Sequence, residues 1–330
     1  MYPVLFKPIL LVLDIILIDI INRKIIANMK KLDNSTNEEN RIESYSNSIP
    51  TNPSAVNEET PLNLLNLNWK ERDLPERIRT KHVHRLHPYL GKFIPQLVEI
   101  FLRKYFKSGQ TILDPFCGSG TTLVQANELG INSIGYDISA FNVLLSKAKT
   151  HKYDIDLVKF EIHDALSKIQ ASIKTDGTEQ LELWERKADE IKQNTSSQYL
   201  FEWFSSNALS ELLTYREIIS KNNYKYSDLL KIILSRSARS SRLVRHFDLE
   251  FPKSPQKEPY QCYKHSRECY PVQEAFKFIK RYSIDTVKRV SEYSLIQTDA
   301  VVDVRHENSI SANFPKIDGL ITSPPYVGLI

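Results

Sequence analysis

The spacing of apolar residues changes several times along the chain, and each change predicts a different element. Over residues 94–105 the apolar positions recur at helical intervals. A short apolar run at 111–114 precedes a glycine-containing turn, and a second helical stretch follows over 121–129. Another strand is predicted over 132–138, and another helix up to about Lys149. This order of strand, helix, strand and helix predicts an α/β fold with a parallel-rich sheet covered by helices.

The alternation stops at about residue 155 and resumes near residue 291. Between them, residues 155–290 are mainly helical in pattern, with a proline-rich interruption, and we interpret them as an insertion. Two further core strands are predicted at 294–299 (SLIQTD) and 318–322 (DGLIT). The core domain is therefore expected at 69–154 and 291–330.

The first 68 residues differ from the rest of the chain. Residues 9–21 are strongly apolar, but they are short for a bilayer span and are interrupted by Asp14 and Asp19, so we expect no contact with a membrane. Residues 30–62 are rich in polar residues and nearly lack aromatic ones, which predicts a disordered lead-in.

Charge adds a candidate partner. The whole chain has a formal net charge of +4, yet residues 221–290 hold 16 Lys and Arg against 7 Asp and Glu. Such a basic block favours a polyanion, although a solvated helical face would look similar. The candidate phosphate contacts include four arginines at every third position of SRSARSSRLVRH and two cations of a tyrosine-containing segment. These residues are Arg236, Arg239, Arg242, Arg245, Lys264 and Arg267.

The three cysteines are too few for a disulfide framework and fit a reducing, cytoplasmic setting. Cys262, His265 and Cys269 could supply three zinc ligands. No fourth ligand follows at a suitable spacing, so we expect no metal site.

The strongest chemical signal is the segment DPFCGSGTT between the first predicted strand and its helix. Gly118 and Gly120 allow a tight turn and a close backbone approach to a ligand. Asp137 ends the second strand, where a carboxylate accepts hydrogen bonds from ribose in doubly wound folds. Together they predict an adenosine-containing cofactor.

This segment resembles the cofactor-binding motif of the DNA amino-methyltransferases, which methylate adenine N6 or cytosine N4. The resemblance implies a Rossmann-like fold and S-adenosyl-L-methionine as cofactor, with Asp114 near the methionine amino group and Asp137 at the ribose. The segment HPYLGKF is similar to a family element that packs against the methionine end, and Thr298-Asp299-Ala300 resembles the position facing the adenine amine, for which Asp303 is a rival. The implied cofactor residues are Lys92, Phe93, Asp114, Pro115, Phe116, Gly118, Gly120, Thr122, Asp137 and Asp299.

The segment Thr322-Ser-Pro-Pro-Tyr326 follows the last predicted strand and resembles the catalytic motif of this family. An exocyclic amine is a poor nucleophile, and acceptors around its N–H groups help it to attack a sulfonium methyl. We assign this role to the Ser323 hydroxyl and the Pro324 carbonyl, whose direction Pro325 helps to fix, while Tyr326 offers an aromatic face to a flipped base. Alone, the segment could be an ordinary Pro-Pro turn.

The resemblance also narrows the reaction. A serine at the first motif position leans towards cytosine N4, whereas cytosine C5 chemistry needs a cysteine after a proline, which this chain lacks. We therefore expect a site-specific methyltransferase of double-stranded DNA from a restriction-modification system. An RNA amino-methyltransferase and a non-catalytic DNA-binding half of a split enzyme are the alternatives.

Only four residues follow Tyr326, whereas the family's sheet has further strands beyond the catalytic motif. We expect a second chain or a missing C-terminal segment to complete the fold, and we expect these 330 residues alone to be inactive.

Overall fold

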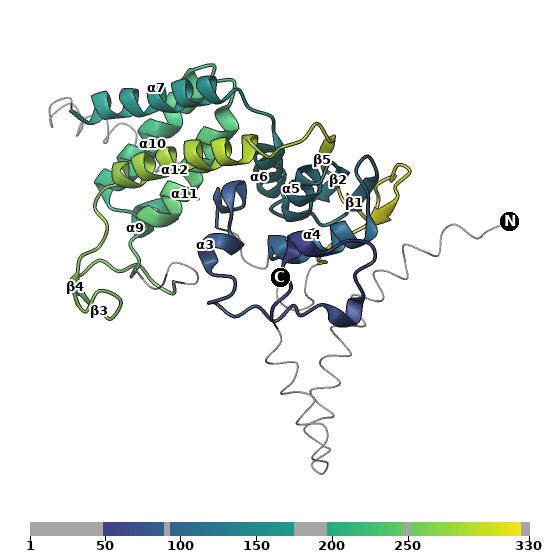
Figure 1. Ribbon diagram of the computed structural model, residues 1–330. Coiled ribbons are helices and arrows are strands. Elements are labelled where there is room, and N and C mark those ends of the chain that lie inside the picture. The colour runs from purple at the N-terminus through teal and green to yellow at the C-terminus, as the bar shows by residue number, and fades with distance from the viewer. Residues whose placement is uncertain (1–48, 89–92, 175–196, 247, 249–251, 325–330) are drawn as a thin grey trace, which may run out of the picture. The chain divides into compact units, whose positions relative to one another are not determined.

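The computed structural model describes residues 49–88, 93–174, 197–246, 248 and 252–324 (Figure 1). The chain forms two compact units: the first comprises Met1–His84, Tyr89–His151 and Ile296–Ile330, and the second comprises Arg85–Pro88 and Lys152–Leu295. Nearly all of the second unit thus comes from one stretch between two parts of the first. The sequence predicts such an interruption at 155–290.

The first unit contains a parallel sheet. Its strands are β1 (Thr111–Asp114), β2 (Asn132–Asp137), β5 (Val302–His306) and β6 (Gly319–Leu320). They lie in the order β5-β2-β1-β6, and every neighbouring pair is parallel. The α/β fold with a parallel sheet is therefore confirmed. From β1 the chain builds the sheet first on one side and later, with β6, on the other, so the carboxyl ends of β1 and β6 flank a topological switch point.

Helices accompany these strands as the sequence predicts. They are α4 (Pro95–Tyr105), α5 (Thr121–Glu128) and α6 (Ala140–Thr150). Pro95 occupies the first turn of α4, and the Ser139 hydroxyl caps α6 by accepting the N–H of Asn142 at 3.4 Å. The buried face of α4 contributes Val98 and Leu102 to the core under the sheet.

The predicted strand at 294–299 is wrong. Helix α12 (Phe276–Ser294) ends in this segment, and residues 295–301 form no strand. Asn127 holds the segment by donating to the Ala300 carbonyl at 3.0 Å and accepting the Thr298 N–H at 3.2 Å. The third strand in the chain order of this sheet is instead β5, which begins at Val302.

The expectation of disorder is wrong for residues 49–62, where the short helix η1 (Pro53–Ala55) forms and η2 (Leu62–Leu64) begins. The carbonyls of Glu58 and Thr60 accept hydrogen bonds from the Lys104 ammonium of α4, at 3.3 and 2.6 Å. These polar residues are ordered because a side chain of helix α4 donates hydrogen bonds to their backbone carbonyls. Two further short helices follow, α3 (Glu76–Arg79) and η3 (His82–Arg85). The apolar run at 9–21 lies outside the described residues.

The second unit is mainly helical, as expected. Helices α7 (Ile155–Lys174), α10 (Ser206–Lys221), α11 (Ser227–Ser241) and α12 pack against one another, and α9 (Ser197–Trp203) contacts α10. An antiparallel hairpin of β3 (Tyr260–Cys262) and β4 (Arg267–Cys269) was not predicted. Among the described residues, no helix is both long and apolar enough to cross a bilayer.

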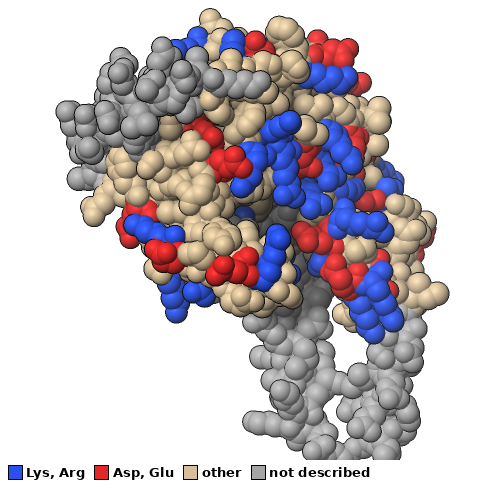
Figure 2. Space-filling model, turned by 90° about the vertical axis from the view of Figure 1, so that its left-hand side faces the viewer, with Lys and Arg blue, Asp and Glu red and all other residues tan. Residues whose placement is uncertain are grey.

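Charged side chains are unevenly spread over the surface. Figure 2 shows one face on which Lys and Arg side chains gather, with Asp and Glu set among them. In the second unit, a hollow of about 260 Å³ has a strongly basic lining. The lining residues are Arg85, Arg236, Arg281, Tyr282, Ile284, Asp285, Lys288 and Arg289.

Candidate functional site

The turn between β1 and α5 is the centre of the candidate site. Gly118 and Gly120 both have positive φ, 49° and 76°, and Gly120 caps the start of α5. A Cβ at residue 120 would lie 2.8 Å from the Ser146 hydroxyl oxygen, so glycine is required for both the conformation and the close approach of α6. The turn is further held by Ser146, whose hydroxyl donates to the Gly118 carbonyl at 2.8 Å.

Asp137 joins this turn to the end of β2. Its Oδ2 accepts the N–H of Gly118 at 2.9 Å, and its Oδ1 accepts the N–H of Ser139 at 2.8 Å and the side-chain amide of Asn142 at 3.1 Å. Because a carboxylate offers about four acceptor positions, Oδ2 has room for one more donor. The carboxylate is half-buried and lies at the predicted edge of the sheet.

Asp114 joins the same turn to the segment after β6. The Thr322 hydroxyl donates to Asp114 Oδ1 at 2.7 Å, and the Phe116 N–H donates to the same oxygen at 3.2 Å. Burial raises the pKa of Asp114 to about 6, although the hydrogen bond from Thr322 opposes this shift. The beginnings of the two predicted motifs, 208 residues apart in the chain, are thus in direct contact.

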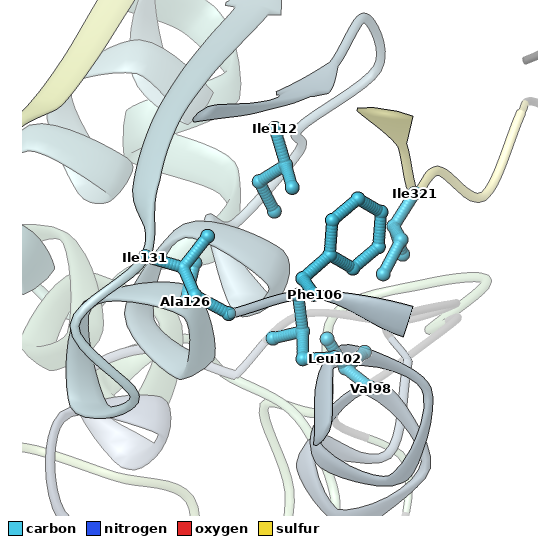
Figure 3. Close-up of a cluster of buried hydrophobic side chains, with 7 residues drawn as sticks. All are labelled: Val98, Leu102, Phe106, Ile112, Ala126, Ile131 and Ile321. Carbon is cyan, nitrogen blue, oxygen red and sulfur yellow. The ribbon is translucent and has the colours of Figure 1, made fainter. Parts of the chain in front are cut away.

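Strand β6 is positioned by close packing. Ile112 and Leu113 of β1 pair with Gly319 and Leu320, and a side-chain carbon at Gly319 would overlap the Phe106 ring. Figure 3 shows Ile321 directed toward this ring within the buried cluster, whose members are Val98, Leu102, Phe106, Ile112, Ala126, Ile131 and Ile321. This anchor fixes the chain one residue before Thr322. Ser323 is half-buried and Pro324 exposed, whereas Pro325 and Tyr326 lie outside the described residues.

The other residues of the predicted cofactor turn occupy different depths. Pro115 and Thr122 are buried, while the Phe116 side chain is 39% exposed. Ser119 Oγ and Thr121 Oγ1 are buried and have no hydrogen-bond partner within the described part of the chain. Because a buried hydroxyl without a partner costs free energy, the turn has hydrogen-bonding capacity left for a polar ligand.

Ile138 is a further candidate site residue, which the sequence analysis did not name. It follows Asp137 at the end of β2, and its side chain is 74% exposed. The ring nitrogen Nε2 of His306, the last residue of β5, lies 3.0 Å from the Ile138 carbonyl. An apolar residue directly after a strand-ending carboxylate was the signal available in the sequence.

Asp299 does not lie where we predicted it. It precedes β5, at the amino end of the sheet, whereas the cofactor turn is at the carboxyl end. Its rival Asp303 lies within β5, where the Arg305 guanidinium pairs with it at 2.7 Å. The residue after β5 at the correct edge is Glu307, whose N–H donates to the Asp137 carbonyl at 3.2 Å.

The HPYLGKF segment is only partly described. Phe93 packs against the buried cluster of Figure 3 and thus supports the core, while Lys92 lies outside the described residues. His87 and Pro88 belong to the second unit, in which His87 Nε2 lies 3.2 Å from the Ser235 hydroxyl.

The four arginines do not fan around one helix as expected, because α11 ends at Ser241. Arg236 is buried: its guanidinium pairs with Asp285 at 2.6 Å and lies 4.1 Å from the centre of the Tyr282 ring. Arg242 adopts an extended backbone after α11, and Arg245 lies 6.0 Å from the Tyr260 ring. Only Arg236 and Arg239 are therefore helical.

The hairpin presents the remaining basic candidates. Lys264 and Arg267 are exposed, and Lys264 lies on the turn between the strands. His246, which the sequence analysis did not consider as a ligand, lies beside Cys262, His265 and Cys269. Burial, together with the neighbouring His265 and Lys264, lowers the pKa of His246. No sequence spacing linked it to them.

Comparisons with known proteins agree with this arrangement. The family described as DNA methylase matches residues 22–148, and one described as methyltransferase domain matches residues 106–196. The type II methyltransferase M.MjaII of Methanocaldococcus jannaschii is 37% identical in an alignment 325 positions long that covers 78% of this chain and 61% of the relative. No solved structure gives a significant match.

Two further relatives are more distant. The type II methyltransferase M.BsoBI of Geobacillus stearothermophilus is 25% identical, over 75% of this chain and 50% of its own length. M.MvaI of Kocuria varians, also a type II methyltransferase, is 24% identical, over 80% of this chain and 55% of its own. The chain spans about half to three fifths of the length of these relatives. Its glycine turn, the parallel sheet and these similarities together show that the chain belongs to the family of DNA amino-methyltransferases.

Proposed function

We propose that this chain supplies the cofactor site and the catalytic motif of an enzyme that binds S-adenosyl-L-methionine and methylates an exocyclic amine of a flipped base in double-stranded DNA. The observation that carries the proposal is the hydrogen bond from Thr322 to Asp114, since it joins the segment beginning Ser323-Pro324 to the glycine turn. In open α/β sheets, ligands bind outside the carboxyl ends of the strands at such a switch point.

The residues at this edge fit an adenosine cofactor. Asp137 has an acceptor position for a ribose hydroxyl, and the exposed Ile138 offers an apolar surface to an adenine ring. The Asp114 carboxylate, when ionised, would bind the cationic methionine end. When bound, S-adenosyl-L-methionine supplies an electrophilic methyl group on a sulfonium. Lys92 and Phe93 are further candidates, with Phe93 acting through the core it packs on.

The chain's own groups would prepare the amine. The Ser323 hydroxyl and the Pro324 carbonyl would accept hydrogen bonds from the N–H groups of the target base, which favours a pyramidal nitrogen whose lone pair can attack. The anchored Ile321 and the bond between Thr322 and Asp114 restrain the start of this segment. Tyr326 would stack on the flipped base, with Pro325 restricting the backbone beside it.

We propose cytosine N4 as the favoured target over adenine N6, because Ser323 occupies the first position of the motif, and we propose a restriction-modification system as the setting. Mass spectrometry of nucleosides from DNA methylated by the protein as it occurs in the cell would distinguish the targets. N4-methylcytosine is the expected product. N6-methyladenine would overturn the choice of base, and methylation of RNA alone would favour the RNA alternative.

Cofactor binding can be tested without turnover. Asp137→Ala should weaken S-adenosyl-L-methionine binding by about 1.5–3 kcal/mol, because a charge-assisted hydrogen bond to ribose is lost. Calorimetric titration measures this change. Asp156→Ala, at a carboxylate in the first turn of α7 whose side chain is 92% exposed, is the matched control and should bind normally. Equal affinity of the wild-type chain and Asp137→Ala would remove Asp137 from the site.

A further inference from the structure

The β3–β4 hairpin of the second unit brings four side chains of metal-binding type together. Cys262 and Cys269 lie on its two strands, His265 on the turn between them, and His246 comes from the segment after α11. One ligand atom of each residue lies within 4.8 Å of those of the other three. Both cysteines are free thiols and are buried.

The hairpin register explains why the thiols meet. Tyr260 pairs with Cys269, and Cys262 pairs with Arg267, so the two cysteines occupy diagonal positions on one face of the ribbon. Their side chains form a small buried cluster with Tyr260. Ser266 adopts a positive φ of 52°, which closes the turn and brings His265 back over this face.

Three of the distances between donor atoms are close to those around one tetrahedral ion. His265 Nδ1 lies 3.6 Å from Cys262 Sγ and 3.4 Å from Cys269 Sγ, and His246 Nδ1 lies 4.0 Å from Cys262 Sγ. Zinc–sulfur bonds of about 2.3 Å and zinc–nitrogen bonds of about 2.0–2.1 Å at a tetrahedral angle place S and N about 3.6 Å apart. Little rearrangement would therefore enclose an ion.

The hairpin also needs a stabilising element. Its strands have three residues each, and an isolated two-stranded ribbon is at best marginally stable in water. The small apolar cluster of Tyr260, Cys262 and Cys269 gives it little core. Tyr260 adds a local tie, because its hydroxyl accepts a hydrogen bond from the backbone N–H of His246 at 3.0 Å. Small elements of this kind are commonly held by a metal ion.

We infer that His246, Cys262, His265 and Cys269 form a structural zinc site that holds the hairpin to the end of α11. Two thiolates and two imidazoles suit zinc, and four protein ligands leave no open position, which is the arrangement of structural rather than catalytic sites. This inference replaces the sequence-based expectation of no metal. The site would fix the turn that carries the exposed Lys264, a candidate for contact with nucleic acid.

Metal content tests the inference directly. The full chain, purified without added metal or chelator, should contain about one zinc ion per molecule by inductively coupled plasma mass spectrometry. Cys262→Ala and His246→Ala should lose most of it. Cys117→Ala and His163→Ala, which change a cysteine and a histidine outside the cluster, should retain it. Absence of zinc from the wild-type chain before and after incubation with zinc, or retention in Cys262→Ala, would overturn the site.

A second measurement needs no variant and so does not depend on whether the variants fold. Zinc should protect Cys262 and Cys269 of the wild-type chain from alkylation, and a chelator should expose both, as peptide mass spectrometry can show. Cys117, buried in the first unit, serves as the internal control because its labelling should not respond to the chelator. Labelling that ignores zinc and chelator alike, or a disulfide between Cys262 and Cys269 in the native protein, would contradict the inference.

Discussion

Asp114 and Asp137 belong to one site but have opposite surroundings. Asp114 is 3% exposed, and its burial raises its pKa, whereas Asp137 is half-buried and accepts three N–H groups. Asp114 therefore combines a proposed role in binding with a cost to the folded state, as functional residues often do.

Asp114→Asn should stabilise the fold at high pH. The folded pKa is about 6 against an ordinary value of 3.8, so the ionised carboxylate lowers stability. This loss is absent below about pH 4, develops as the pH rises to 6 and is complete above it, where it amounts to about 3 kcal/mol. Urea denaturation should find the variant more stable by about 1–3 kcal/mol at pH 8 and equal at pH 4.

Cofactor affinity should fall in the same Asp114→Asn variant, because the neutral amide cannot pair with the methionine ammonium. Asp156→Asn is the control for both measurements, since its carboxylate is exposed. A variant that is less stable than the wild type at pH 8 would show that the carboxylate is not an unfavourable buried charge.

Two glycines allow the cost of backbone strain to be measured apart from the cost of steric crowding. Gly109 and Gly120 both have positive φ, 87° and 76°, but only at Gly120 would a Cβ meet a neighbour, the Ser146 side chain. Gly109→Ala should cost about 1–2 kcal/mol from the backbone alone, and Gly120→Ala about 1 kcal/mol or more beyond that. Thermal denaturation and cofactor titration measure both. We expect only Gly120→Ala to lose cofactor affinity, and equal effects of the two variants would argue against the tight turn.

At the scale of elements, the sequence predicts helices and strands well where apolar periodicity is strong. It predicts them poorly where charged residues interrupt that periodicity. Strand β1 and helix α4 coincide with their predicted ranges because nearby core residues set their patterns. Strand β5 was missed because it carries Asp303 and Arg305, a pair typical of edge strands. The apolar pair Leu295-Ile296 was mistaken for core, yet both side chains are exposed.

The basic residues of the second unit should have different roles, depending on the element that carries them. Lys264 and Arg267, exposed on the hairpin, are proposed phosphate contacts, so replacing both with alanine should weaken DNA binding and reduce its salt slope by about two. Arg236→Ala should instead lower stability by about 2 kcal/mol or more, because Asp285 loses its closest partner. Fluorescence anisotropy at several salt concentrations, paired with urea denaturation, distinguishes these effects. An unchanged salt slope in the hairpin variant would show that Lys264 and Arg267 are solvated surface residues that do not contact phosphates.

At the scale of the whole molecule, the chemical motifs were easier to predict than the second unit. The contact between Asp114 and Thr322 follows from the parallel sheet order, which places two strand ends together across 208 residues. By contrast, His246 reaches the hairpin only through the packing around α11, and no periodicity records such a contact. The interior arginine Arg236 was assigned to the surface for the same reason, since helical spacing does not show which neighbour covers a face.

The division into two compact units predicts how a ligand effect should spread. S-adenosyl-L-methionine at about 100 times its dissociation constant stabilises a binding unit by about 2.7 kcal/mol, which slows exchange of its most protected amides about 100-fold. We expect this slowing in β1, β2 and α5, whose backbone surrounds the proposed cofactor site. The amides of α10 and α11 belong to the other unit and should keep their rates.

Hydrogen exchange followed by mass spectrometry, with and without the cofactor, makes this comparison within one sample. Buffer without ligand and a matched concentration of adenosine provide the controls, because adenosine lacks the methionine end that Asp114 would bind and should protect less. Equal slowing in both units would show that they unfold as one cooperative body and not as two separate units. Unchanged rates throughout would mean that the cofactor does not bind, and the proposed function would fail with them.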